Sequence, residues 1–442
     1  MRIRLYTLWE QLSGSFWFLP ALMVVSAAIL ALVMNSIDNA NPQVAIPLLS
    51  WVYTGSPEGA RTLLSTIAGS MISVAGVTFS ITIATLSLAS SQLGPRLLSN
   101  FMRDRGNQIV LGTFVSIFTY CLLTLRAIRS EDNSEFVPYL SLTLAMLLAF
   151  VSLGVLIFFF HHVSTMIQAQ NVVADIGRDL ASSIERLFAI QSARTPYEYA
   201  LRGEEDIPQD FEDDMQFVIV EASGYLQAID YQALRQVATE HDLLLLLRFR
   251  PGDFIAKGSE IIGVHPADRL SQDIEKALQL AFTTGARRLR VQDVEYTIEQ
   301  LVEIAVRALS PGINDPFTAI ACLDQFSTTL ADLAERPIPS GYYYDDSGAL
   351  RVISDRITFS GIINSAFNQI RQHCRSDVAV TIRMLEVIAI ITARTRTDAQ
   401  RDALIRQAEM IKRASDETIT EANDLEDIHE RYDLIMRMVA AA

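Results

Sequence analysis

The sequence predicts an α-helical membrane protein with four transmembrane helices and a cytosolic α+β region, which combines a small β-sandwich or barrel module with a helical domain. The 442-residue chain is 50% apolar, with a mean hydropathy of +0.25. Four long apolar runs lie within its first 165 residues. The net charge also differs between the two parts of the chain. Residues 1–165 carry eight Arg and seven acidic residues, whereas residues 166–442 carry 28 basic and 44 acidic residues.

The expected domain boundaries follow these shifts in composition. A cytosolic N-terminal segment covers 1–15, and the transmembrane domain covers 16–165. Its spans are expected at about 16–35, 62–92, 108–126 and 136–160, each close to the roughly 20 residues that a membrane-crossing helix needs. A helical connector (166–213), the β module (214–267) and a mostly helical domain (268–442) follow.

Basic residues in the short loops indicate the orientation of the spans. Five arginines (2, 4, 96, 103 and 105) fall on one side, and three (61, 126 and 129) fall on the other. Because short cytoplasmic loops carry the excess of Lys and Arg, we expect both termini in the cytoplasm. The aromatic residues at 16–18 mark the entry of the first span into the membrane interface.

The second span is uncharged between Arg61 and Arg96 but is rich in Ser, Thr and Gly. Eight of its small residues keep within an arc of about 100° at about 100° per residue. This small-residue stripe consists of Ser65, Gly69, Ser73, Gly76, Ser80, Ala84, Ser87 and Ser91. The stripe is a packing seam against the other spans, a pore lining, or a surface for self-association without conduction. Gly94 and Pro95 are expected to end the helix.

A pore requires several copies of the second span around one axis, which implies a cyclic homo-oligomer. Arg61 and Arg96 would then form positive rings near its two mouths and produce a weak preference for anions. The alternative is that both side chains snorkel to the membrane surface. Apart from Arg126 at the edge of the third span, no expected span contains Asp, Glu, Lys or Arg, which argues against pumps and proton symporters.

The cytosolic region begins after His161 and His162, which are expected at the membrane interface or, alternatively, sense cytosolic pH. Strand patterns fill 214–266, and the turn at 251–253 resembles that of biotinyl and lipoyl carrier domains. A carrier-type lysine is missing, so we expect no prosthetic group or other cofactor. Helices are expected near 270–284, 293–309, 315–335, 357–374, 377–394, 397–415 and 417–440, with a hairpin around 342–352.

The segment Ser310–Ala319 (SPGINDPFTA) is the most distinctive part of the cytosolic region. One helix is expected to end at Pro311-Gly312, and Asn314 or Asp315 is expected to cap the next helix. As an alternative, the exposed N–H groups of that helix start form a regulatory anion site with Arg307, Asn314 and Asp315.

Several classes of function are disfavoured. The acidic cytosolic region lacks the basic patch that nucleic acid or an anionic membrane surface requires. The three cysteines, at 121, 322 and 374, are expected to be reduced and buried, and their spacing indicates neither disulfides nor a metal site. The chain contains none of the common hydrolase, metalloprotease or nucleotide-binding motifs, so we do not expect an enzyme.

Segments 77–96, 223–230 and 310–319 resemble a widespread bacterial family of predicted inner-membrane proteins classed as a domain of unknown function. The resemblance covers nearly the whole chain; it implies a multi-pass protein of the bacterial inner membrane but no activity and no catalytic residues. Our leading hypothesis is a homo-oligomeric ion channel that contacts the lipid bilayer, other copies of itself and permeant small ions. The alternative is a non-conducting, membrane-anchored scaffold or sensor whose acidic domain binds a protein partner.

Overall fold

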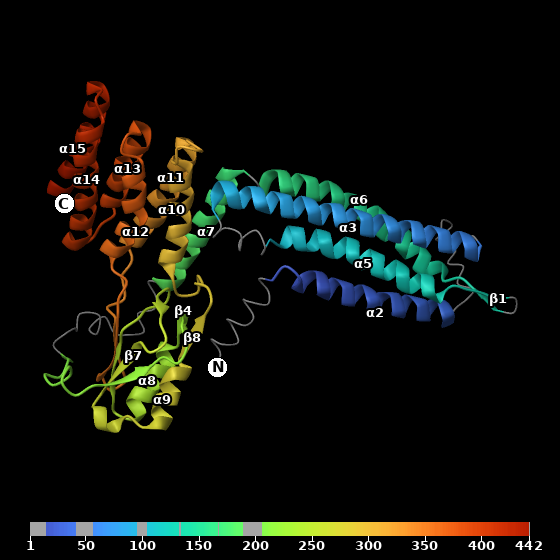
Figure 1. The fold of residues 1–442 in the computed structure, drawn as a ribbon, viewed down its shortest axis with the longest axis horizontal. Coiled ribbons are helices and arrows are strands. Elements are labelled where there is room, and N and C mark those ends of the chain that lie inside the picture. Colours follow the sequence, from blue (N-terminus) through green and yellow to red (C-terminus); the bar gives the residue numbers. More distant parts are fainter. Residues whose placement is uncertain are drawn as a thin grey trace. The chain divides into compact units, whose positions relative to one another are not determined.

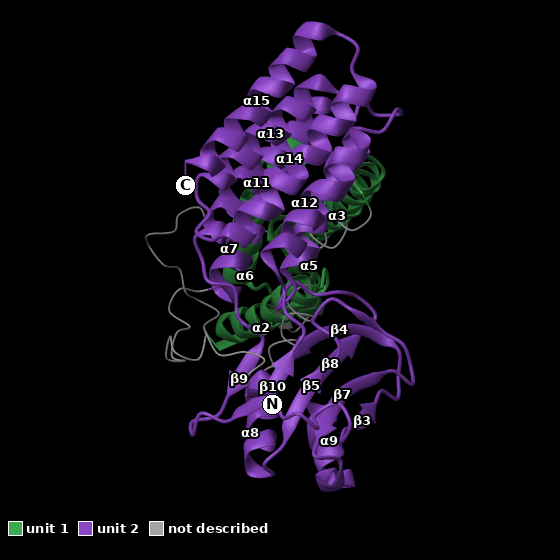
Figure 2. Cartoon of the chain, turned by 90° about the vertical axis from the view of Figure 1, so that its left-hand side faces the viewer, with its two compact units in different colours: residues 1–171 green, residues 172–442 purple. Residues whose placement is uncertain are grey.

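The computed structural model describes residues 15–40, 56–94, 104–131, 134–166, 168–188 and 206–441. The chain forms two compact units, residues 1–171 and residues 172–442 (Figures 1 and 2). Nearly all of the expected N-terminal segment (1–15) therefore lies outside the described residues.

Among its described residues, unit 1 contains four apolar helices that are long enough to cross a membrane. They are α2 (Phe18–Ala40), α3 (Pro57–Leu93), α5 (Arg105–Ala127) and α6 (Tyr139–Met166). Helix α5 packs against the other three and buries Phe114, Tyr120 and Cys121 completely or almost completely. A short hairpin of β1 (Arg129–Glu131) and β2 (Ser134–Phe136) joins α5 to α6. The predicted class, four apolar helices before an α+β region, is confirmed.

Local signals fix the ends of these helices. Ser56 caps α3 by accepting a hydrogen bond from the Gly59 N–H at 3.2 Å, and Gly94 ends the helix with a φ of +120°. Asp104 caps α5 by accepting from the Asn107 N–H at 2.8 Å. With 37 residues, α3 is roughly 55 Å long, which exceeds the ~30 Å thickness of a hydrocarbon core.

The first helix is longer than predicted and includes Asp38, which is 5% exposed. Its carboxylate accepts hydrogen bonds from the backbone N–H groups of Leu140 (3.0 Å) and Ser141 (2.9 Å) and from Ser141 Oγ (2.6 Å). These N–H groups belong to the first turn of α6, where no carbonyl of the same helix can accept them. The helices that could cross a membrane are longer than the expected spans, so the expectation that they lack Asp, Glu, Lys and Arg does not hold for the whole helices. They include Asp38 in α2, Glu58 and Arg61 in α3, and Arg105 and Arg126 in α5.

Unit 2 contains two β-sheets with two short helices beside them (Figure 2). The five-stranded sheet has the order β3 (Gln216–Ile219), β7 (Glu260–His265), β5 (Leu244–Leu247), β10 (Leu350–Ser354) and β9 (Tyr342–Tyr344). The three-stranded sheet has the order β6 (Phe254–Ile255), β4 (Gly224–Ile229) and β8 (Phe282–Gly285). Both sheets share one apolar core with α8 (Tyr231–Glu240) and α9 (Gln272–Leu280). A single turn of 3-10 helix, η3 (Ala267–Arg269), follows β7.

The β region differs from the predicted module at 214–267. Three of its strands, β8, β9 and β10, come from later in the chain, and α8 interrupts the strands. Strand β5 is a run of leucines that needs a neighbour on each side, and β10 supplies the second one in parallel. The helix expected at 270–284 ends at Leu280, because the residues that follow pair with β4.

Helix α7 (Ala169–Leu187) crosses the boundary between the two units and lies within the expected connector; residues 189–205 of that connector lie outside the described residues. The bundle continues with α10 (Val294–Ala308), α11 (Pro316–Ala334), α12 (Phe359–His373), α13 (Val378–Thr392), α14 (Asp398–Thr418) and α15 (Ala422–Ala440). Each of these six has an N-cap side chain that accepts a backbone hydrogen bond. The first five begin within two residues of the predicted starts, whereas α15 begins five residues later than predicted.

Candidate functional site

The small-residue stripe of α3 faces away from the rest of unit 1. All eight stripe residues are exposed, from Ser65 to Ser91. The residues that α3 buries lie on the opposite side, about 200° away at about 100° per residue. They are Ala60, Leu64, Ala68, Met71, Ala75, Thr78 and Ala89. Within the described residues, the seam that joins α3 to its own unit is therefore a different face from the stripe.

No other part of the described structure covers the two glycines of the stripe. A Cβ atom added at Gly69 or Gly76 would meet no heavy atom within 4 Å. The Ser65, Ser73 and Ser80 hydroxyls donate to backbone carbonyls one turn earlier, at 2.8–2.9 Å. Each hydroxyl oxygen keeps lone pairs that can still accept a hydrogen bond. The stripe is therefore an uncovered polar face. The hydroxyl groups of these three serines donate within α3 and need no acceptor on another helix.

The other outward faces of unit 1 have a different composition. Large apolar side chains are exposed on α2 and α6, for example Leu32 (61%), Phe150 (68%) and Ile157 (72%). Such residues are typical of surfaces that face lipid. On α3, exposed large apolar residues such as Ile72 and Val77 border the stripe on either side. The stripe is thus a polar track with apolar residues on both sides, and exposed Thr66 and Ser70 extend it on the Val77 side.

Arg61 lies at the N-terminal end of the stripe. Its guanidinium donates to the carbonyl oxygen of Ile128 at 3.2 Å, and Ile128 is the residue that ends α5. The contact ties the start of α3 to the end of α5. Arg96, the other expected mouth residue, lies outside the described residues.

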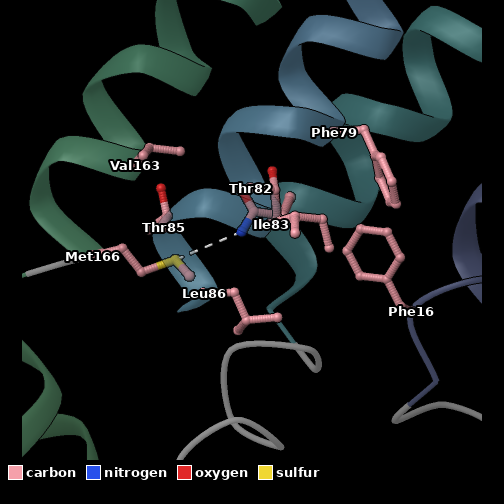
Figure 3. A pocket seen from close by; sticks show the side chains of 9 residues that line it. Phe16, Phe79, Thr82, Ile83, Thr85, Leu86, Val163 and Met166 are labelled. Atoms are coloured by element: carbon pink, nitrogen blue, oxygen red, sulfur yellow. Dashed lines mark hydrogen bonds between the residues drawn. The ribbon is translucent and has the colours of Figure 1, made fainter. Parts of the chain in front are cut away.

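A cavity of about 190 Å³ lies near the opposite end of α3 (Figure 3). Side chains of α3, α5 and α6 line it, among them Thr82, Leu86 and Met166. Asn107 is 4% exposed and also lines the cavity; its Nδ2 lies 3.8 Å from Met166 Sδ, and its Oδ1 has no partner within the described residues. The lining is otherwise almost entirely apolar, which suits an apolar occupant.

The two histidines near the end of α6 differ in their surroundings. His161 is exposed, whereas His162 Nε2 lies 2.7 Å from an Asp104 carboxylate oxygen. The His162 ring also stacks on Phe158, with ring centroids 5.3 Å apart. Because Asp104 caps α5, this contact ties the end of α6 to the start of α5. The sequence identified the histidine pair but not the carboxylate partner.

The SPGINDPFTA segment forms the turn between α10 and α11. Asn314 has a φ of +53°, and the Asp315 N–H donates to the Ala308 carbonyl at 2.8 Å. The Asp315 carboxylate caps α11 by accepting from the Thr318 N–H (3.2 Å) and Thr318 Oγ1 (2.5 Å). Arg307 lies in the last turn of α10. The anion site remains a prediction, and an anion would compete with Asp315 for the same N–H group.

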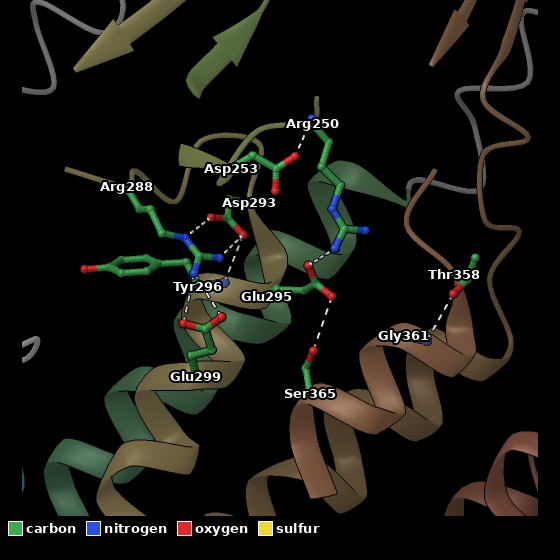
Figure 4. A network of polar contacts seen from close by, with 10 residues as sticks. All are labelled: Arg250, Asp253, Arg288, Asp293, Glu295, Tyr296, Glu299, Thr358, Gly361 and Ser365. Carbon is green, nitrogen blue, oxygen red and sulfur yellow. Dashed lines mark hydrogen bonds and ion pairs between the residues drawn. The ribbon is translucent and has the colours of Figure 1, made fainter. Parts of the chain in front are cut away.

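A network of buried charges joins the β region to the helices of unit 2 (Figure 4). Arg288 forms two hydrogen bonds with Asp293 (2.7 and 3.0 Å) and two with Glu299 (both 2.9 Å). Arg250 bonds Glu295 at 2.7 Å, and Ser365 of α12 donates to the same carboxylate at 3.3 Å.

Burial raises the pKa of both Asp293 and Glu295. The network holds the turn at 251–253 against α10 and fixes the β region to the bundle. Sequence reasoning missed it, because Arg250 and Ser365 are distant in the chain from Glu295, and because Arg288, Asp293 and Glu299 resemble ordinary surface charges.

Comparisons with known proteins agree with this architecture. The family model for predicted membrane proteins named DUF2254 matches residues 13–389. Uncharacterised proteins of Mycobacterium bovis and Mycobacterium tuberculosis are each 27% identical over 421 residues, which cover 94% of this chain and 79% of each relative. No solved structure matches the chain.

Proposed function

The chain belongs to the DUF2254 family of predicted membrane proteins, and we propose that it forms a cyclic homo-oligomer in which the small-residue stripes of α3 line an ion-conducting pore. One observation carries the proposal: the stripe is exposed on the single chain, opposite the face by which α3 packs against its own unit. A face of small, hydroxyl-bearing residues of this length along a membrane-crossing helix is suited to contact with solvent or with another copy of the chain.

Further support comes from the contrast with α2 and α6. Their exposed side chains are large and apolar, so lipid suffices to cover them. Apolar residues such as Ile72 and Val77 border the stripe on α3 and are suited to contacts between neighbouring copies. Around a symmetry axis, this arrangement buries the apolar borders between subunits and leaves the polar track facing the axis.

The expected ion preference follows from Arg61 and Arg96. Rings of these residues near the two mouths would attract anions and repel cations, which predicts a weakly anion-selective pore. We place the protein in the bacterial inner membrane with both termini in the cytoplasm, because the arginine distribution favours that side. We propose no enzymatic role.

Current recordings from purified protein in planar bilayers test the pore. We expect Ser73→Leu to lower the single-channel conductance by about tenfold or more, because a leucine from every subunit would narrow and dry the lumen. Ser70→Leu is the matched control: Ser70 is also exposed on α3 but lies outside the stripe. The control should conduct like the wild type. Equal effects of the two substitutions would contradict the pore.

The second candidate is a non-conducting scaffold or sensor. The serine hydroxyls of the stripe bond to carbonyls of their own helix, so they need no water, and a face of small residues also permits close helix contact between copies. In that arrangement the stripes would meet without a lumen, and the acidic cytosolic domain would bind a partner. Absence of current at every tested potential, membrane tension and pH would favour the scaffold.

A further inference from the structure

The cavity of unit 1 lies where three of its helices begin or end (Figure 3). Phe16 lies just before α2, Asn107 is in the first turn of α5, and Met166 is the last residue of α6; all three line the cavity. Part of α3, between Phe79 and Leu86, completes much of the lining. Because every lining residue belongs to unit 1, the cavity is formed within one unit.

The length of α5 places the cavity near one edge of the bilayer. Helix α5 has 23 residues and is therefore about 35 Å long, which is close to the ~30 Å thickness of a hydrocarbon core. Its first turn is thus expected at the membrane interface. Trp17, which follows the cavity residue Phe16, is 61% exposed, as is typical of an interface residue. Molecules with an apolar body and one polar group are suited to the same level.

The cavity has the size of a small aromatic molecule. Its volume is about 190 Å³. For comparison, an engineered apolar cavity of about 150 Å³ in another protein binds benzene. The rings of Phe16 and Phe79, with centroids 6.4 Å apart and planes inclined by 55°, form part of the wall, and Leu86 and Val163 add further apolar surface. A benzene-sized ring with small substituents therefore fits this space.

Asn107 adds one polar group to this apolar lining. It is 4% exposed, and among the described lining residues its Oδ1 is the one buried side-chain polar atom without a hydrogen-bond partner. Its Nδ2 lies 3.8 Å from Met166 Sδ. A thioether sulfur can accept a hydrogen bond but cannot donate one, so the amide nitrogen faces the sulfur, and the carbonyl oxygen remains an unused acceptor.

Contacts beside Asn107 hold that acceptor in place. The Asn107 backbone N–H donates to Asp104 Oδ2 at 2.8 Å, and the same oxygen lies 2.7 Å from His162 Nε2. His162 is one turn before Met166 on α6. The start of α5 and the end of α6 are therefore joined next to the cavity, so the position of the acceptor does not depend on an occupant.

A buried acceptor without a donor is unfavourable, because its hydration is lost and no hydrogen bond replaces it. Water is poorly suited to supply the donor here, because a buried water molecule usually makes about three hydrogen bonds and cavities with apolar walls remain dry. An apolar molecule that carries one donor is complementary both to the walls and to the acceptor. A hydroxyl group is the simplest donor of this kind.

We propose that this cavity, here called the Asn107 cavity, binds a small apolar molecule with one hydroxyl group, of about the size of a phenol. The apolar part fills the space between α3, α5 and α6, and the hydroxyl donates to Asn107 Oδ1. The ligand enters from the membrane interface. This inference does not depend on conduction through α3.

Two fluorinated probes of similar size test the site with the full chain in detergent micelles. The first, para-fluorophenol, carries the donor, whereas para-fluorotoluene has a methyl group in place of the hydroxyl. Fluorine NMR titrations give the affinity for each probe. The ratio of the two affinities is compared between variants in the same detergent, so that partitioning of the probes into micelles cancels.

Three substitutions separate the acceptor from the space around it. Asn107→Leu removes the acceptor. Ser164→Leu is the matched control, because Ser164 is exposed on α6 and does not line the cavity. Val163→Phe leaves Asn107 in place but fills the cavity, because Val163 is a buried part of the wall.

We expect both probes to bind the wild type saturably. In Asn107→Leu the affinity for para-fluorophenol relative to para-fluorotoluene should fall about tenfold, because the hydroxyl then lacks an acceptor. Continued binding of para-fluorotoluene by this variant would show that its cavity is intact. The Ser164→Leu control should keep the wild-type ratio, and Val163→Phe should bind neither probe.

An unchanged ratio in Asn107→Leu would overturn the inference. If that variant does not fold, Val163→Phe remains decisive, since persistent binding of the probes to it would place them outside the cavity. Failure of both probes to bind the wild type would also contradict the site, because it would indicate that lipid or detergent chains occupy the cavity.

Discussion

Replacing Asp38 with alanine is expected to destabilise unit 1 strongly, although Asp38 lies near the end of its helix. The carboxylate accepts three hydrogen bonds from Leu140 and Ser141, and it is 5% exposed. Loss of an N-cap costs about 0.5–2 kcal/mol, and each buried donor left without an acceptor costs about 1–3 kcal/mol. A total of about 3 kcal/mol is expected, because water reaches some of the freed N–H groups at the helix end.

Thermal unfolding in detergent measures this effect. At about 2–4 °C per kcal/mol for a unit of this size, Asp38→Ala should lower the Tm by about 6–12 °C. Asp38→Asn keeps one acceptor oxygen and should lose about half as much. Asn39→Ala is the control, since Asn39 is the exposed neighbour on the same helix. If the Tm of Asp38→Ala fell no further than that of the control, the carboxylate would not support α6 as described.

Two further substitutions test unit 2. Gly252 has a φ of +105° and a Cβ there would lie 2.4 Å from Asp293 Oδ2, so Gly252→Ala should lower the free energy of unfolding by more than about 2 kcal/mol. Gly258→Ala, with a φ of +88° but open space, should cost less, and equal losses would show that the close approach to Asp293 is unimportant. Burial acts to raise the pKa of Asp345, but hydrogen bonds from Ser347 and Arg351 outweigh it and hold that pKa at about 2. Because this is below the unfolded value of about 3.8, the stabilisation is complete above about pH 4 and disappears as the pH falls to about 2. The difference in unfolding free energy between wild type and Asp345→Asn should therefore shrink over that interval, and a pH-independent difference would refute this origin.

Local patterns predicted the helices well. The apolar runs of the spans and the caps of the bundle helices depend on residues within a few turns of one another. Gly94 ends α3 as expected, and the three cysteines are free and buried as expected. The start of α11 at Pro316, with Asp315 as its cap, also follows from neighbouring residues.

Contacts between distant segments were not predictable in the same way. The leucine run of β5 does not reveal that its second partner is β10, more than a hundred residues later. Asp38 follows an apolar run and therefore resembles a loop residue, whereas its partners are at 140 and 141.

Predicting the role of the α3 stripe needed both local patterns and contacts between distant segments. Its phase on the helix follows from the spacing of Ser65, Gly69 and the residues after them. Whether that phase faces its own subunit depends on which side of α3 packs against α5, and the sequence of α3 does not specify that side. The buried face at Ala68 and Ala75 is also made of small residues, so composition did not distinguish the two faces.

Thiol accessibility along α3 tests the pore most directly. Single cysteines at 65, 69, 73, 76 and 80 would be treated in proteoliposomes with a charged reagent that does not cross membranes. Controls are Ala68→Cys, on the buried face of α3, and Ile157→Cys, on the exposed apolar face of α6. If the stripe lines a water-filled lumen, all five positions react and both controls remain unlabelled. Protection of all five positions, at the level of the controls, would contradict the pore.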